Sequence, residues 1–419
     1  MHYFGYKNGE LFCEEVPIKK IVEEVGTPVY IYSAQTIKRH FKVFENSFLS
    51  VDHIICYSVK ANSNLAILSL LRSLGSGADI VSGGELQRAL KAGIPPQKIV
   101  FSGVGKTEKE MEMALSAGIL MFNVESLEEL EVLGEVAKKL GKPAPFALRV
   151  NPDVDPQTHP YISTGLKKNK FGIPEEMVVE AYKKAKDHPF LNPIGLDAHI
   201  GSQITSIAPF KDALYRLKKI WEEITSLGIE LKYLDLGGGL GIIYNNEEPP
   251  LPEEYAEAII KEAKDLKATL ILEPGRVIVG NAGILVTKVL YNKENIEKKF
   301  VIVDAGMNDL IRPAFYQAYH KIVPLEEKKD VEEVVVDIVG PICESSDFFA
   351  KDRKMPKLRR GDLLAIMSAG AYGFVMSSNY NSRLRVPEVL VDGDRFFITR
   401  RRETIEDLLA PESVPAIYL

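Results

Sequence analysis

The chain has 419 residues, more than one hydrophobic core usually supports, so we expect one large domain and a smaller one. The formal net charge is -6, no run of Lys and Arg is long enough to bind nucleic acid or anionic lipid, and no apolar stretch reaches the roughly 18 residues of a membrane helix, so we expect a soluble protein with a small-molecule partner. The three cysteines, Cys13, Cys56 and Cys343, are widely spaced, which argues against a disulfide framework or a metal site and favours a reducing cytoplasm.

Between residues 34 and 275 the pattern alternates between helical segments and short apolar strands. A helix is predicted first, over residues 34–48, and helical segments follow the first seven strands. Eight strands are predicted, at 54–60, 78–82, 99–103, 120–124, 146–151, 194–200, 233–237 and 269–275. Because an open doubly wound sheet usually stops at five or six strands, the pattern favours a TIM-like (β/α)8 barrel that begins with a helix.

After about residue 280, strands follow one another without intervening helices, which predicts a second, antiparallel β domain. The step Asp392–Gly393 between alternating apolar residues is typical of a hairpin. The first thirty or so residues are also strand-like. The predicted organisation is N-terminal strands that join the β domain (1–33), the barrel (34–278) and the antiparallel domain (279–419).

Reactive residue types lie where the barrel strands end, which is where this fold builds its active sites. They are Lys60, Ser82, Arg149, His199, Ser202, Gly237, Gly238, Gly239, Glu273, Gly275 and Arg276. Such clustering indicates one site at the carboxyl ends of the strands.

The segment DLGGGLG (235–241) follows the seventh strand, so its backbone N–H groups can approach an anion such as phosphate. A tight turn is the alternative explanation for its glycines. It lacks the dinucleotide pattern G-x-G-x-x-G, because residue 242 is Ile. GVGKT (103–107) is not a nucleotide-binding loop, because Val100 stands where the first glycine is required, and Lys106 is interpreted as an ordinary helix start.

Position alone leaves other roles open for the remaining candidates. Lys60 follows an apolar strand, where a lowered pKa would make it a good Schiff-base lysine, but a lysine whose amine reaches solvent at a strand end fits equally. His199 can be a hydrogen-bonded core histidine, and Glu273 can simply pair with Arg276.

Five motifs, in order and over nearly the whole chain, resemble the diaminopimelate decarboxylases, which belong to the alanine-racemase-like group of pyridoxal-phosphate enzymes. The motifs are YSVKAN (57–62), HIGSQ (199–203), DLGGGLG (235–241), EPGR (273–276) and CESSD (343–347). One departure stands in KKNKFG (167–172), where Asn169 occupies a position that is often serine in the family.

The resemblance implies that the cofactor is pyridoxal 5'-phosphate and that Lys60 carries it as a Schiff base. Its phosphate would be held by Ser202, the glycine loop, chiefly Gly239, and the backbone of Pro274, Gly275 and Arg276. Glu273 would face the pyridine nitrogen and His199 would stack on the ring. Further cofactor contacts are implied for Arg149, Tyr372 and, less directly, Asp79.

For the substrate, the resemblance implies carboxylate binding by Arg276, Arg312 and Tyr316, with Glu344 at the distal ammonium and Tyr372 nearby. Cys343 would be the acid that protonates the carbanion. In this family Cys343 and Glu344 reach the site from the partner subunit, so a homodimer is implied.

The expected activity is therefore decarboxylation of meso-2,6-diaminopimelate to L-lysine and carbon dioxide. Decarboxylation of ornithine or arginine and amino-acid racemisation are near alternatives. More distant ones are a barrel protein that carries the cofactor without turnover and a barrel enzyme acting on sugar phosphates.

Overall fold

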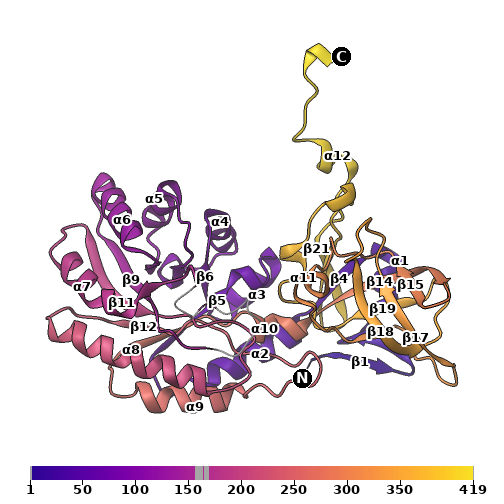
Figure 1. Ribbon diagram of the computed structural model, residues 1–419, viewed down its shortest axis with the longest axis horizontal. Coiled ribbons are helices and arrows are strands. Elements are labelled where there is room, and N and C mark those ends of the chain that lie inside the picture. The colour runs from indigo at the N-terminus through magenta and orange to yellow at the C-terminus, as the bar shows by residue number, and fades with distance from the viewer. Residues whose placement is uncertain (1, 156–163, 165–168, 419) are drawn as a thin grey trace. The chain divides into compact units, whose positions relative to one another are not determined.

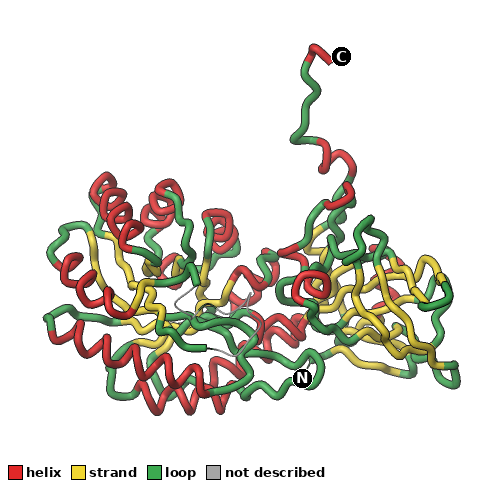
Figure 2. The backbone as a smooth tube through the Cα atoms, viewed as in Figure 1, coloured by secondary structure: helices red, strands yellow, loops and turns green. Residues whose placement is uncertain are grey.

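The computed structural model describes residues 2–155, 164 and 169–418. The chain divides into two compact units, one of Ile37–Val279 and one of Met1–Thr36 with Gly280–Leu419 (Figure 1). In Figure 2 the first unit has helices around its strands, whereas the second consists mostly of strands and loops. No helix in the described part of the chain is long and apolar enough to cross a membrane.

The first unit is a closed barrel of eight strands, as the sequence predicts. In chain order these are β5 (His53–Ser58), β6 (Gly77–Ile80), β7 (Ile99–Phe101), β8 (Met121–Val124), β9 (Ala144–Asn151), β11 (Leu191–Asp197), β12 (Tyr233–Asp235) and β13 (Thr269–Leu272). All neighbouring strands pair in parallel, and the pairing of β13 with β5 closes the barrel. The short β10 (Ile173–Pro174) adds to β9.

Helices connect the barrel strands in the predicted alternation. They are α2 (Ala34–Ser47), α3 (Leu65–Ser73), α4 (Gly83–Lys91), α5 (Glu108–Ala117), α6 (Leu127–Leu140), α7 (Glu175–Lys186), α8 (Ala208–Ser226), α9 (Pro252–Ala263) and the short α10 (Arg276–Val279). Local sequence sets their ends. Thr107 and Glu110 form a capping box at the start of α5, and Gly118, at a φ of 72°, ends it.

The second unit is built on strands that include the N-terminus of the chain. β1 (Phe4–Lys7), β2 (Glu10–Cys13) and β3 (Val16–Pro17) form a small sheet of their own. The large sheet is assembled from β4 (Val29–Ser33), β14 (Gly283–Glu294), β15 (Lys299–Val303), β16 (Ile322–Pro324), β17 (Glu333–Val339), β18 (Phe348–Pro356), β19 (Leu363–Ile366), β20 (Glu388–Asp392) and β21 (Arg395–Arg400). The short helices are α1 (Ile18–Val25), α11 (Arg312–Tyr316) and α12 (Ile405–Leu409).

The predicted hairpin is confirmed, since Asp392 pairs with Arg395 across a turn in which Gly393 has a φ of 68°. Three details of the prediction are wrong. Residues 18–25 form helix α1 rather than a strand, because their apolar residues recur at helical spacing. The large sheet is not purely antiparallel, since β15 pairs with β17, and β4 with β20, in parallel. The first barrel strand ends at Ser58, and Lys60 lies in the 3-10 turn Val59–Ala61.

Candidate active site

Five barrel strands carry an apolar side chain in the barrel interior. These are Cys56, Val100, Met121, Ala147 and Ile271. Because side chains two residues apart on a strand share a face, the layer above them, toward the carboxyl ends, is polar. It consists of Ser58, Ser102, Asn123, Arg149 and Glu273, all of them buried. The apolar layer thus forms a floor on which the polar residues stand.

Lys60 is held beside a buried carboxylate. Its Nζ lies 2.5 Å from Oδ2 of Asp79, whose side chain is fully buried, whereas the Lys60 side chain is about one-third exposed. Ser58 Oγ also lies 2.8 Å from the same Asp79 oxygen. Asp79 therefore neutralises and orients the amine, while the lysine keeps access to the barrel mouth.

The glycine run after β12 packs too tightly for side chains. A Cβ on Gly237 would lie 2.5 Å from Nδ1 of His199, and one on Gly239 would lie 2.6 Å from the carbonyl oxygen of Gly201. Gly237 and Gly239 also have φ values of 62° and 113°, which L-residues rarely adopt. Any other residue at Gly237 or Gly239 would therefore clash with neighbouring atoms and strain the backbone.

His199 lies in the loop after β11, and its imidazole is neutral. The N–H of Gly238 donates to its Nδ1 at 3.0 Å, so that nitrogen carries no proton. Burial lowers the pKa of His199 well below its usual value, and the positive charges of Arg149 and Lys60 lower it further. The ring is thus an uncharged aromatic surface next to the glycine turn.

Glu273 follows β13 and keeps its proton more strongly than an ordinary glutamate. Burial raises the pKa of Glu273 well above its usual range, Asp235 and Asp79 raise it further, and Lys60 opposes them. Its Oε2 lies 4.0 Å from Nδ1 of His199. A carboxyl of this kind can share a proton with a basic ring nitrogen.

Arg149, on β9, is held by an acidic partner that the sequence did not single out. Its Nη1 donates to Glu125 Oε1 at 2.7 Å, and its Nη2 donates to the carbonyl oxygen of His199 at 3.2 Å. Burial lowers the pKa of Arg149, but the charges of Glu125 and Asp197 outweigh it and raise that pKa. Arg149 thus ties β9 to the loop that carries His199.

The EPGR segment brings Arg276 to Ser202. Arg276 Nη2 donates to Ser202 Oγ at 3.0 Å, and Nη1 donates to the hydroxyl of Tyr244 at 2.7 Å. A Cβ on Gly275 would lie 3.0 Å from the side chain of Ser58, and the carbonyl of Pro274 accepts from Ser58 N at 3.1 Å. The segment is therefore pinned against the end of β5, beside Lys60.

The remaining predicted residues belong to the second unit, where they form three local groups. Arg312 and Tyr316 lie on one turn of α11, with the guanidinium 5.8 Å from the tyrosine ring centre. Cys343 and Glu344 are exposed on the loop before β18, where Cys343 N donates to Asn381 Oδ1 at 2.8 Å. Tyr372 has a φ of 55°, an unusual value for a tyrosine.

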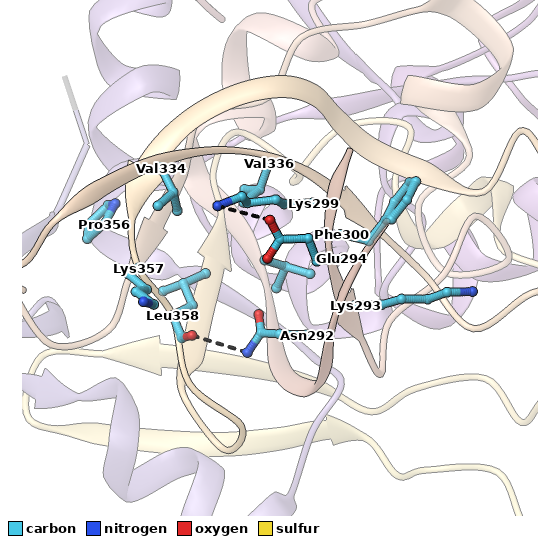
Figure 3. A pocket seen from close by; sticks show the side chains of 11 residues that line it. Asn292, Lys293, Glu294, Lys299, Phe300, Val334, Val336, Pro356, Lys357 and Leu358 are labelled. Atoms are coloured by element: carbon cyan, nitrogen blue, oxygen red, sulfur yellow. Dashed lines mark hydrogen bonds and ion pairs between the residues drawn. The ribbon is translucent and has the colours of Figure 1, made fainter. Parts of the chain in front are cut away.

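Three cavities formed by described residues contain none of the predicted residues. One of about 250 Å³ lies on strands of the second unit, with the ion pair Lys299–Glu294 in its wall (Figure 3). A groove of about 640 Å³ runs between α6 and α7. Among the described residues, no three His, Cys, Asp or Glu side chains are grouped so that they could hold a metal ion.

Comparison with known proteins identifies the family. Residues 34–280 match the model of the "Pyridoxal-dependent decarboxylase, pyridoxal binding domain". The chain is 53% identical to diaminopimelate decarboxylase of Vibrio cholerae over 99% of both chains, and 52% identical to that of Aquifex aeolicus over 98% of this chain and 97% of the relative. The crystal structure of diaminopimelate decarboxylase from M. jannaschii in co-complex with L-lysine matches with a TM-score of 0.94 and 43% identity, covering 99% of each chain.

The chain belongs to the diaminopimelate decarboxylase family. The cofactor of these pyridoxal-dependent decarboxylases is pyridoxal phosphate, as the resemblance implied, and the barrel residues fit it. The glycine turn leaves a cradle that a Cβ would fill, a lysine amine lies beside a buried aspartate, and a buried carboxyl and a neutral imidazole lie within 4.0 Å of each other.

Sequence reasoning missed two polar residues near the predicted cofactor residues, Asn123, which is buried, and Glu85, which is partly buried. Asn123 donates to Asp235 Oδ2 at 3.0 Å and to Ser102 Oγ at 3.1 Å. Glu85, whose Oε2 accepts from Val81 N, has a pKa raised to about 7, chiefly by burial. Both could have been recognised in the sequence, one as a polar residue at the end of an apolar strand and the other as a polar residue in the first turn of the helix that follows a strand.

Lys106, interpreted as an ordinary helix start, is a fully buried cation that donates to Glu129 at 2.6 Å and to the carbonyls of Gly103 and Asn123. The segment 167–172 lies partly outside the described residues. Of that segment, Gly172 donates its backbone N–H to Glu125 at 3.0 Å.

Proposed function

We propose that this protein decarboxylates meso-2,6-diaminopimelate to L-lysine and carbon dioxide with pyridoxal phosphate. The observation that carries the proposal lies at the ends of the barrel strands, where the Lys60 amine is 2.5 Å from buried Asp79, and His199 and Glu273 lie against a glycine turn that admits no side chain. Similarity to diaminopimelate decarboxylases along nearly the whole chain supports the choice of substrate.

In this proposal, barrel residues attach the cofactor and hold its phosphate. Lys60 supplies the amine for covalent attachment, and the adjacent carboxylate of Asp79, 2.5 Å from its Nζ, orients that amine. Ser202, Gly239 and the backbone from Pro274 to Arg276 hold the phosphate. The close turn serves this role because small residues let backbone N–H groups approach an anion.

Pyridoxal phosphate supplies an electron-accepting ring for the electron pair that remains when the bond to the carboxylate breaks. Glu273 holds a proton at the ring nitrogen, because its raised pKa lets it share one there. The neutral ring of His199 packs against the cofactor without placing a second positive charge beside it. Arg149, fixed by Glu125, contributes a cation at the ring edge, and Tyr372 provides a further contact.

The substrate's distal end is itself an amino acid, so it needs partners of both charges. Arg276, Arg312 and Tyr316 bind its carboxylate, since a planar guanidinium grips a carboxylate through paired N–H groups. Glu344 balances the distal ammonium. Cys343, exposed on its loop, donates the proton that replaces the departing carboxylate.

Cys343 and Glu344 act in the site of a partner subunit, so the working form is a homodimer, located in the cytoplasm. The loop that carries both residues is ordered by Asp347, whose carboxylate accepts from Ile342 N at 2.6 Å and from Met307 N at 2.7 Å. An ordered, exposed loop suits residues that serve another subunit.

Release of carbon dioxide and formation of lysine from diaminopimelate, measured against ornithine and arginine with purified holoenzyme, tests the proposal. We expect turnover of diaminopimelate alone. Preferred turnover of ornithine or arginine would overturn the substrate, and exchange of the substrate α-proton without carbon dioxide release would indicate a racemase. Absence of a visible absorbance band that depends on Lys60 would exclude the cofactor chemistry altogether.

A further inference from the structure

A buried histidine contacts the guanidinium of Arg312 in the second unit. Arg312 Nε donates to His320 Nε2 at 3.3 Å, and both side chains are buried, with relative exposures of 6% and 0%. His320 was not among the residues that the sequence singled out. It contacts Arg312, one of the arginines that bind the substrate carboxylate in the proposed function.

Hydrogen bonding on the other side of the ring defines the histidine tautomer. His320 Nδ1 lies 2.8 Å from the carbonyl oxygen of Met367, which can only accept, so Nδ1 carries the proton. Nε2 is then unprotonated and accepts from Arg312. A second proton would set a donor against a donor and place two positive charges in contact, so this arrangement requires neutral His320.

The backbone around His320 is rigid because two strands meet there. Ile322 at the start of β16 pairs with Ile366 at the end of β19, and Met367 N donates to the carbonyl of Lys321 at 2.8 Å. The carbonyl of His320 itself accepts from Arg353 Nη1 at 3.1 Å. The imidazole is thus fixed to a sheet rather than to a mobile loop.

A bond at Nε has a specific consequence for a guanidinium. The group is planar, with one N–H on Nε and two each on Nη1 and Nη2. Holding Nε from a fixed ring sets the guanidinium plane and hence the direction of the Nη edge. An arginine side chain held in this way loses less rotamer freedom when it binds a carboxylate.

We propose that His320 is a positioning residue for substrate recognition: as a neutral acceptor anchored to Met367, it aims Arg312 at the carboxylate that remains in the product. This inference rests on the proposed function, in which Arg312 binds that carboxylate. In this proposal His320 acts through Arg312, as a positioning residue.

The test uses three variants of His320 in the holoenzyme. His320→Leu has a comparable volume but no acceptor, His320→Asn places its amide near Nδ1 and none at Nε2, and His320→Gln extends an oxygen toward Arg312. We expect KM for diaminopimelate to rise about tenfold in the Leu and Asn variants, as for the loss of one hydrogen bond to a charged group, with kcat little changed. The Gln variant should restore most of the affinity.

A ligand comparison separates aiming from general damage. L-lysine retains one carboxylate and 1,5-diaminopentane has none, so inhibition by L-lysine should weaken about tenfold in His320→Leu while inhibition by the diamine stays constant. In an Arg312→Lys background the same substitution should have no additional effect. His53, which likewise lies 3.0 Å from a backbone carbonyl, that of Val51, provides the matched control, and His53→Leu should leave KM unchanged.

Wild-type KM and lysine inhibition in His320→Leu and His320→Asn would overturn the inference. Equal weakening for lysine and the diamine would overturn it too, since the histidine would then act on the whole site. Should the Leu variant not fold, the comparison of Gln with Asn decides the question. Failure of the proposed function is distinguishable, because the unmodified protein would then show no turnover of diaminopimelate.

Discussion

Replacing Gly239 by alanine should damage both cofactor binding and stability. A Cβ there would lie 2.6 Å from the carbonyl oxygen of Gly201 and 3.1 Å from Ile204, whereas ordinary contact begins at 3.4 Å. The overlap of 0.8 Å is with backbone, and Gly239 O also accepts from Ile204 N at 2.9 Å, so the turn cannot move without loss of that bond.

Two costs add up in this variant. The φ of 113° costs an L-residue about 1–3 kcal/mol, and overpacking against a backbone group costs about 1–3 kcal/mol. Relief of the overlap moves the phosphate-binding backbone by up to about 1 Å, a displacement that can lower activity about 100-fold. We therefore expect cofactor affinity and kcat/KM to fall together by about that factor.

The assay is titration of the apoprotein with pyridoxal phosphate, followed by absorbance, together with thermal unfolding and steady-state kinetics. Gly118→Ala is the matched control, because Gly118 has a φ of 72° but no atom within 4 Å of its Cβ. It should show the backbone strain without any loss of cofactor affinity. Wild-type affinity for pyridoxal phosphate in Gly239→Ala would show that the turn does not need a glycine at this position to bind the cofactor.

Three further predictions concern charge and assembly. Because burial raises the pKa of Glu85 from 4.5 to about 7, the folded state should lose up to about 3 kcal/mol as pH rises through that window, and Glu85→Gln should flatten this dependence in unfolding experiments at pH 5 and 7.5. Lys106→Met should destabilise the protein by about 3 kcal/mol in denaturant unfolding, because it leaves Glu129 buried without its cation; an unchanged midpoint would contradict this. Mixing the inactive variants Lys60→Ala and Cys343→Ala should restore about a quarter of wild-type activity if subunits share sites, and none if each site is built from one chain.

Much of the barrel was predictable from the sequence because its signals are local. Apolar runs such as FALRVN and the glycines that follow helices act over a few residues, and they gave the eight strands and their order. Lys60, His199 and Glu273 were also predicted as site candidates, because each follows such a run. Helix α1 was missed because its eight residues are flanked by strands on both sides.

What the sequence determined by itself was the alternation of strands and helices, the order of the motifs and the reactive residue types at the strand ends. What only the tertiary structure decided was how those residues interact. The neutral state of His199, the raised pKa of Glu273 and the partners of Arg149 and Arg312 depend on residues 8 to 213 positions away in the chain. Burial and hydrogen bonding across strands set these properties, and neither is encoded in any short stretch of the chain.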